Sequence, residues 1–187
     1  MLEFIILGFL MCGETSGYDL KQWMTKSTSY FFDASFGSIY PALKRLTQKN
    51  MVTFCEVVEG SKYKKVYRIT DSGKKAFLKW VEEPIAFEKS RQDHLVKIFF
   101  YEFLPKEKAI LRLKNFVSQI EPVARELTEQ KKEAEQKYDV YQFCYRYETM
   151  RYGIQYYNFL LNWCNELIDK LENDPRYRGV RFKEDSE

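Results

Sequence analysis

Apolar residues near the start of the chain recur at the spacing of short helices. Residues 2–11 are apolar almost throughout, which predicts a buried helix that stops near Gly13. A second helix should follow, because side chains suited to an N-cap precede an apolar stripe. The candidate caps and inward-facing residues of this second helix are Thr15, Ser16, Leu20, Trp23 and Met24.

The stretch FGSIYPALKRL, residues 36–46, predicts a third helix with two unlike faces. At about 100° per residue, Ile39, Leu43 and Leu46 fall in one narrow sector, which should face a core. The opposite side has little aliphatic bulk and is suited to contact a partner. Its residues are Gly37, Tyr40, Pro41, Lys44 and Gln48.

The glycine and the proline of this stretch fit a helix that is capped by Ser38. Pro41 then falls in the first turn, where a missing backbone N–H costs little. Gly37 lies just outside and lacks bulk, so backbone N–H groups at the positive helix end can approach a phosphate. Tyr40 and Lys44 would project toward a nucleic-acid groove. The alternative is an ordinary capped core helix whose glycine serves a turn.

Two β-rich runs follow and predict an antiparallel hairpin over residues 52–70, with its tip at residues 60–65. A two-stranded hairpin is not stable alone, so it must pack on the helices. A fourth helix should be capped by Thr70 or Asp71 and end at Pro84. Its apolar residues are expected to pack inward, namely Phe77, Leu78, Trp80 and Val81. This order of elements is that of a winged helix-turn-helix.

Beyond Pro84 the pattern is helical throughout. Residues 91–104 form one expected helix, and Pro105 ends it and starts the next. The side chains expected on one side of the first of these helices are Leu95, Ile98, Phe99 and Phe103. In the next helix, apolar residues alternate at spacings of three and four, a mean period of about 3.5 that is typical of a coiled-coil seam. These seam residues are Ile110, Leu113, Val117, Ile120, Ala124 and Leu127. Pro122 should kink this helix.

A last helix is expected over residues 139–171, with a stripe of large residues at similar spacing. The stripe consists of Tyr141, Tyr145, Tyr152, Tyr156, Phe159, Trp163 and Leu167. The predicted fold is therefore mainly α with a small β-hairpin. It comprises a winged helix-turn-helix domain over 1–84, an all-α antiparallel coiled-coil-like dimerisation domain over 88–173, and a polar tail over 174–187.

Charge is concentrated in one part of the chain. The 187 residues have a net charge of +3, which does not by itself indicate a nucleic-acid partner. Residues 41–79, however, hold ten Lys or Arg and three acids, and ten minus three gives +7. A polyphosphate partner explains such clustering, because each neutralised phosphate releases condensed counterions. The alternative is a solvated lysine face.

The remaining chemistry excludes several classes of protein. The single histidine, His94, has no second histidine or nearby cysteine, and the glycines form no phosphate-binding loop. We therefore expect no enzyme, cofactor or metal site. The apolar opening is shorter than the roughly 20 residues that cross a bilayer, so no membrane span is expected. The four cysteines lie far apart and the start lacks signal-peptide features, which predicts free thiols in a reducing cytoplasm: Cys12, Cys55, Cys144 and Cys164.

Two motifs, GSIYPALKRL and YRITDSGK, lie in the expected third helix and at the junction of hairpin and fourth helix. With them, residues 1–84 resemble the DNA-binding domain of the PadR family of bacterial transcriptional regulators. The helical remainder is similar in architecture to the branch with a larger C-terminal domain, related to virulence-gene activators. The resemblance implies a homodimeric repressor with its third helix in the major groove, its wing on the DNA backbone and its C-terminal helices at the dimer interface. In several members a small aromatic effector releases DNA.

The resemblance also implies roles for individual residues. Those expected to bind DNA are Tyr18 on the second helix, Ser38, Tyr40 and Lys44 on the third, and Lys62, Lys64 and Lys65 on the wing. Asn50 stands where the family usually has glycine, and Asn also tolerates a left-handed turn. The wing has fewer glycines and prolines than the family pattern. Substitutions at Lys62 or Lys64 are expected to weaken binding to all DNA alike and to flatten its salt dependence.

A two-fold dimer would place its recognition helices on half-sites about 34–36 Å apart, so the operator should be an inverted repeat. Aromatic residues are dense over 138–163 and are interleaved with arginines, which suggests an effector pocket. Its candidate residues are Tyr145, Arg146, Arg151 and Tyr152. The alternative for this region is a dimer seam packed with aromatic residues. The alternative for the whole chain is a protein-interaction module built on a helical coiled coil.

Overall fold

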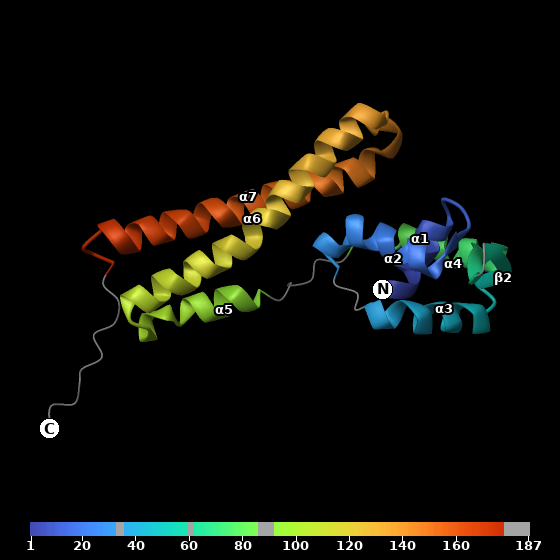
Figure 1. The fold of residues 1–187 in the computed structure, drawn as a ribbon, viewed down its shortest axis with the longest axis horizontal. Coiled ribbons are helices and arrows are strands. Elements are labelled where there is room, and N and C mark those ends of the chain that lie inside the picture. The colour runs from blue at the N-terminus through green and yellow to red at the C-terminus, as the bar shows by residue number, and fades with distance from the viewer. Residues whose placement is uncertain (33–35, 60–61, 86–91, 178–187) are drawn as a thin grey trace, which may run out of the picture. The chain divides into compact units, whose positions relative to one another are not determined.

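The computed structural model of the chain describes residues 1–32, 36–59, 62–85 and 92–177 (Figure 1). The side chains of Phe36, Glu59 and Lys62 lie outside that description. The chain divides into two compact units, Met1–Phe87 and Glu88–Glu187. Among the described helices, none combines the length and the apolar character that a bilayer span requires.

The described part of the first unit contains four α-helices and a small sheet, and Figure 1 shows their arrangement. The helices are α1 (Leu2–Leu10), α2 (Gly17–Lys26), α3 (Ile39–Gln48) and α4 (Asp71–Glu82), with short 3₁₀ turns at Thr28–Tyr30 and Phe36–Ser38. The strands are β1 (Thr15–Ser16), β2 (Val52–Glu59) and β3 (Lys62–Ile69). The predicted winged helix-turn-helix order is confirmed, because three helices, a hairpin and a fourth helix follow one another.

One apolar core holds this unit together. The inward residues of α3 that the sequence predicted, Ile39, Leu43 and Leu46, are buried there. They pack with Leu7 of α1 and Leu20 of α2, which are also fully buried. Because the apolar side of α3 is used in this way, its opposite side stays available to solvent or a partner.

The sheet is antiparallel with strand order β1-β3-β2. The two-residue strand β1 was not predicted, because it is too short to show a period of two. The hairpin was predicted, but its tip is shorter than expected. The pairing of Glu59 with Lys62 leaves only positions 60 and 61 between the strands, and both lie outside the described residues. Lys64 and Lys65 were expected at the tip but belong to β3, where they pair with Val57 and Glu56 of β2.

The junction of α3, β2 and α4 is tightly bonded. Asn50 has a φ of 53°, so the predicted left-handed turn is confirmed. Thr70 caps α4 by accepting from the backbone N–H of Gly73 at 3.1 Å, and its hydroxyl donates to the carbonyl of Asn50 at 2.7 Å. A Cβ on Gly73 would lie 2.1 Å from the carbonyl oxygen of Met51. The end of α3, the base of the hairpin and the start of α4 are thus fixed to one another.

Two expectations for this unit were wrong. Phe77 and Trp80 pack toward α1, where Trp80 stacks on Phe4 at 4.9 Å between ring centroids. Leu78 and Val81, however, lie on the outward side of α4 and are half exposed. Ser38 precedes α3 but makes no side-chain cap hydrogen bond. The physical reason is that the third helical position is Pro41, which has no N–H to donate, and that Ser38 has helical φ and ψ.

The second unit is built on two long helices, α6 (Lys106–Lys137) and α7 (Cys144–Asn173), which run side by side as a hairpin (Figure 1). Their antiparallel direction is clear from an ion pair of 2.7 Å between Lys114 and Glu172 near one end. A short helix, α5 (Asp93–Phe99), precedes them, with 3₁₀ turns at Tyr101–Phe103 and Val140–Phe143. The predicted all-α antiparallel arrangement of this region is confirmed.

The seam of α6 agrees with the sequence. The buried residues of α6 include Leu113, Val117, Ile120, Ala124 and Leu127, and Ile110 packs at the edge of their cluster. The helix continues through Pro122, and the predicted kink there stays a prediction. On α7 the expected stripe of large residues packs on the core for only part of its length. Its buried residues are Leu160, Cys164 and Ile168, whereas Tyr145, Tyr152 and Phe159 are exposed.

The helix before Pro105 is also shorter than predicted, since α5 ends at Phe99. Of its expected inward side, Ile98 packs on the core, but Leu95, Phe99 and Phe103 are exposed in the single chain. His94 stacks on Phe116, with 5.2 Å between ring centroids, and its partial burial lowers its pKa. The ring contact with Phe116 connects α5 to α6.

Candidate nucleic-acid interface

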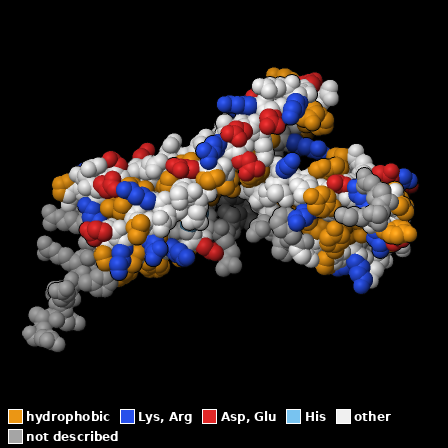
Figure 2. Space-filling view, viewed as in Figure 1, with side chains coloured by type: hydrophobic (Ala, Val, Ile, Leu, Met, Phe, Trp, Pro, Cys, Tyr) orange, Lys and Arg blue, Asp and Glu red, His pale blue; other side chains and the backbone are white. Residues whose placement is uncertain are grey.

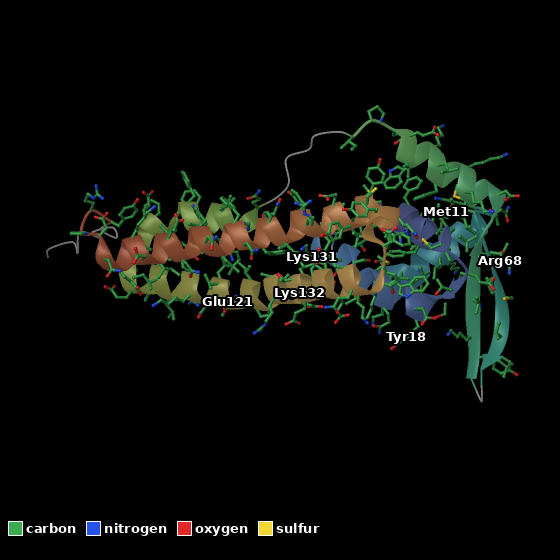
Figure 3. All side chains as sticks on the ribbon, turned by 90° about the horizontal axis from the view of Figure 1, so that it is seen from above. Met11, Tyr18, Arg68, Glu121, Lys131 and Lys132 are labelled. Atoms are coloured by element: carbon green, nitrogen blue, oxygen red, sulfur yellow. The ribbon has the colours of Figure 1, made fainter. Side chains whose placement is uncertain are left out.

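A groove of about 1040 Å³ runs between the outer side of α3, the start of α2 and one face of the hairpin. Its lining combines aromatic rings, hydroxyls and lysines, and no carboxylate is among the described residues that line it. The lining residues are Ser16, Gly17, Tyr18, Tyr40, Lys44, Thr47, Gln48, Phe54, Tyr63, Lys64, Lys65 and Tyr67. Figure 3 shows Tyr18 on α2 beside the hairpin, and Arg68 at the end of β3 away from the tip.

The α3 side of the groove is set by a close helix contact. Tyr40 is 58% exposed, yet its ring rests against the backbone of Gly17 at the start of α2. A Cβ on Gly17 would lie 2.8 Å from the Cε1 atom of Tyr40, so a larger residue there would displace the ring. Lys44 lies one turn further along α3 and is exposed. The geometry confirms that Tyr40 and Lys44 point outward rather than into the core.

The start of α2 forms a second side of the groove. Ser16 is the N-cap, because its hydroxyl accepts from the backbone N–H of Asp19 at 3.1 Å. The same hydroxyl donates to the carboxylate of Asp19 at 2.6 Å. Asp19 also pairs with Lys64 of the hairpin, with 3.3 Å between Oδ2 and Nζ. These contacts lower the pKa of Asp19, chiefly through the Ser16 hydroxyl and then through Lys64.

The hairpin contributes an aromatic and cationic face. Phe54 and Tyr67 are cross-strand partners whose ring centroids are 5.7 Å apart. The ammonium of Lys65 lies 4.3 Å from the centroid of the Phe54 ring, a cation–π contact. Toward the tip, Tyr63 is 82% exposed. Tyr67 is buried at the bottom of this face, and burial raises its pKa.

Most of the clustered cations already have carboxylate partners. Besides the Asp19–Lys64 pair, Arg68 contacts Glu14 at 2.6 Å, and Lys65 contacts Glu56 at 3.8 Å. On the side of α3 that does not line the groove, Arg45 and Lys49 share Glu3 at 2.7 and 2.9 Å. Figure 2 likewise shows Lys and Arg next to Asp and Glu on the visible face. Three acids from earlier in the chain, Glu3, Glu14 and Asp19, therefore compensate part of the local charge of +7.

Lys44 differs from these cations. Among the residues that the structure describes, it has no ion-pair partner, although it lines the groove and is exposed. An exposed lysine with no carboxylate to compete for it is available to an external anion. Lys44 is thus the cation of α3 that is best placed to contact a phosphate or a base edge.

The structure brings together five of the seven predicted DNA-binding residues. Tyr18, Tyr40, Lys44, Lys64 and Lys65 all line the groove. Ser38 is not among the lining residues, and the side chain of Lys62 lies outside the described part of the chain. The contact of each residue with DNA stays a prediction.

Sequence reasoning missed several residues of the site. Gly17, Thr47 and Phe54 line the groove, and Asp19 holds Lys64, but none of them was a candidate. Thr47 follows Lys44 by three residues, so a helical count from Lys44 locates it. The partnership of Asp19 with Lys64 has no such signal, because the residues are far apart in the chain and meet through tertiary packing.

The predicted effector residues all lie on α7. Tyr145 and Tyr152 are seven residues apart, share one side of the helix and are largely exposed. Arg151 contacts Glu148 at 2.8 Å, and the guanidinium carbon of Arg146 lies 5.8 Å from the Phe143 ring centroid. Both cations therefore already have neighbours on or near their own helix. Their role in binding an effector stays a prediction.

The first unit matches a known family. Residues 6–79 match the transcriptional regulator PadR-like family, and residues 90–172 match the virulence activator α C-terminal family. A negative transcriptional regulator from Bacillus subtilis, PadR, is 36% identical over 112 residues. That alignment covers 58% of this chain and 61% of the relative, so the match spans less than two thirds of that protein's length.

Solved structures have the same architecture over nearly the whole chain. A PadR-like transcriptional regulator from Bacillus cereus has a TM-score of 0.80 at 26% identity and covers 92% of this chain and 98% of its own. Bacillus subtilis PadR in complex with operator DNA has a TM-score of 0.78, and in complex with p-coumaric acid 0.73. Each of these two is 22% identical and covers 91% of this chain and 98% of its own. At that identity the likeness establishes a common fold.

Proposed function

The chain belongs to the PadR-like family of transcriptional regulators, and we propose that it binds duplex DNA through the groove between α3 and the hairpin. Members of this family are regulators rather than enzymes, in agreement with the absence of catalysis expected from the sequence. The observation that carries the proposal is the placement of Tyr40 and Lys44 on the outer side of α3, exposed in a groove that Lys64 and Lys65 also line.

In this proposal α3 enters the major groove and the hairpin follows the adjacent backbone. Lys44 contacts a base edge or a phosphate, while Tyr40 is held in position against Gly17. The Bacillus subtilis relative of the same fold has been solved with operator DNA. Its name as a negative regulator supports repression as the outcome for this chain.

We further propose that the chain acts as a homodimer on an inverted-repeat operator. The support is the exposed aromatic side of α7, where Tyr145, Tyr152 and Phe159 recur every seven residues. Aromatic residues at heptad spacing on an exposed helix face are typical of an interface between helices. Two-fold symmetry would then set two α3 helices about 34–36 Å apart, one turn of duplex.

Selection of bound fragments from genomic DNA tests the proposal directly. The expected result is a set of fragments that share an inverted repeat, with retention that weakens steeply as salt increases. Sedimentation of the protein alone should give the mass of a dimer. A protein-interaction module would retain no fragment in a salt-sensitive manner, and that result would contradict DNA binding.

A small aromatic effector is a second proposed partner. It is supported by the solved complex of Bacillus subtilis PadR with p-coumaric acid and by the aromatic and arginine content of α7. Thermal unfolding with p-coumaric acid and other hydroxycinnamates should show stabilisation of the wild type, and a smaller shift for Arg151→Gln. The absence of any shift across such a panel would contradict an aromatic effector.

The proposed location of the protein is the cytoplasm, where a DNA-binding regulator meets its operator. Three of its four free cysteines, Cys12, Cys55 and Cys144, are exposed. Exposed thiols without a disulfide partner suit a reducing compartment.

A further inference from the structure

The carboxylate of Asp19 lies at the rim of the groove that the proposed function assigns to DNA. It contacts Lys64, a groove residue, at 3.3 Å, and both side chains are a little over one third exposed. A carboxylate in this position is unfavourable for binding phosphates, because like charges repel. Its presence therefore calls for an explanation beyond simple charge complementarity.

Asp19 is held in place more firmly than an ordinary surface acid. The hydroxyl of Ser16, which is buried, donates to Asp19 Oδ2 at 2.6 Å, and the backbone N–H of Asp19 donates back to it at 3.1 Å. Ser16 itself is paired with Val66 in the sheet. The Asp19 carboxylate is thus fixed between α2 and β3, and Lys64 of β3 contacts it.

Resting on the proposed DNA-binding function, we propose that Asp19 is the counter-ion that a DNA phosphate displaces from Lys64. In the free protein, the Asp19–Lys64 pair connects the hairpin to α2. On duplex DNA, Lys64 exchanges Asp19 for a backbone phosphate. The exchange makes Asp19 a residue that limits affinity for DNA of any sequence, so a larger share of the binding free energy must come from α3.

This exchange has a distinct salt signature. Salt weakens both the Asp19–Lys64 pair and the Lys64–phosphate pair. The free energy of exchanging Asp19 for a phosphate at Lys64 therefore depends little on salt. Lys44 has no carboxylate partner among the described residues, and its contact with DNA should show the full dependence. The two lysines of one groove are therefore expected to contribute differently to the slope of log K against log salt.

The test is a salt series of anisotropy titrations on one operator duplex and one unrelated duplex. Asp19→Asn keeps an amide oxygen that can accept from Ser16 but removes the charge. We expect it to bind both duplexes roughly three- to tenfold more tightly at about 0.1 M salt, with a slope steeper by up to about 0.9. In the Lys64→Ala background the same change should bring no gain.

Glu121→Gln is the matched control, because it changes the net charge by the same amount at an exposed position of α6, outside the proposed dimer side of α7, and it should leave affinity unchanged. Circular dichroism melts of every variant establish that the fold is intact. A gain that persists without Lys64 would overturn the exchange, since Asp19 would then repel DNA directly. Unchanged or weaker DNA binding by Asp19→Asn would also overturn the exchange. In that case, salt-sensitive binding by the wild type would still support the proposed function. Failure of the wild type to bind either duplex in a salt-sensitive manner would overturn both.

Discussion

The outer side of α3 and the face of the hairpin both present lysines to the same groove, but these lysines differ in their neighbours. Lys44 on α3 has no carboxylate partner among the described residues, whereas Lys64 and Lys65 on the hairpin contact Asp19 and Glu56. The pairs are exposed and individually weak. They still affect the binding free energy that each lysine contributes on contact with a phosphate, because a paired lysine must first break its ion pair.

The first unit carries less net charge than its cluster of cations alone. Residues 1–84 contain twelve Lys or Arg and nine acids, a net charge of +3, and the rest of the chain is neutral. The whole excess of the protein is therefore in the proposed DNA-binding unit. That excess is smaller than the +7 of residues 41–79, because acids such as Glu3, Glu14 and Asp19 return to the same surface.

The largest expected effect disturbs both sides of the comparison at once. Gly73→Ala places a Cβ 2.1 Å from the carbonyl oxygen of Met51, at the junction that fixes α3, the hairpin and α4. Backbone cannot move away cheaply, so we expect a loss of about 3 kcal/mol in the free energy of unfolding. Urea denaturation measures this loss. Gly37→Ala is the control, since its Cβ meets nothing within 4 Å, and an equal effect of the two variants would contradict the assignment.

A smaller change acts on the α3 side alone. Gly17→Ala brings a Cβ within 2.8 Å of the Tyr40 ring, which should turn away from its position in the groove. We expect operator affinity to fall by about 1 kcal/mol, in the range of a lost base contact, with little change in the melting temperature. Anisotropy titration measures the affinity. Gly153→Ala, with an ordinary 3.5 Å contact to Leu127, should bind as the wild type does.

Loss of operator affinity in Gly153→Ala, or none in Gly17→Ala, would mean that Tyr40 is not positioned by α2. The hairpin lysines should be unaffected by either change. The slope of log K against log salt measures the contribution of the hairpin lysines to DNA binding. An unchanged slope in Gly17→Ala would show that only the α3 side of the groove was disturbed.

The smallest expected effect concerns two paired cations in the last turn and C-cap of α3, which do not line the groove. Arg45 and Lys49 hold the pKa of Glu3 below its ordinary value near 4.5. Stability from this contact is therefore present above that pH and is lost as pH falls through the lowered pKa. We expect Glu3→Gln to destabilise the protein by about 0.5 kcal/mol at neutral pH, with a difference from wild type that shrinks as the pH falls below the ordinary pKa of a glutamate. A difference that persisted in acid would contradict the ion-pair origin.

The sequence predicted the fold well where the pattern reports on one chain's own core. The inward residues of α3 and the seam of α6 are buried as expected, because their periodicity reflects a single packed side. The pattern misled for Leu78 and Val81, which were expected to pack inward and are exposed in the single chain. Apolar periodicity does not say whether the covering partner is the same chain or another one.

The candidate site was predicted in outline and missed in its electrostatics. Tyr40 and Lys44 follow from the helical period of one short motif. Asp19 does not, because its meeting with Lys64 depends on how β1 joins the sheet, and a two-residue strand leaves no periodic signal. The cap at Ser38 failed for a local reason, since Pro41 removes the N–H that such a cap would bind.

The most direct test of the central claim is the salt dependence of operator binding by Lys44→Ala against the wild type. If α3 presents Lys44 to duplex DNA, the variant should lose about eightfold in affinity at about 0.1 M salt, and the slope of log K against log salt should become shallower by about 0.9. An unchanged affinity and an unchanged slope would show that DNA does not reach this side of α3, and would contradict the proposed interface.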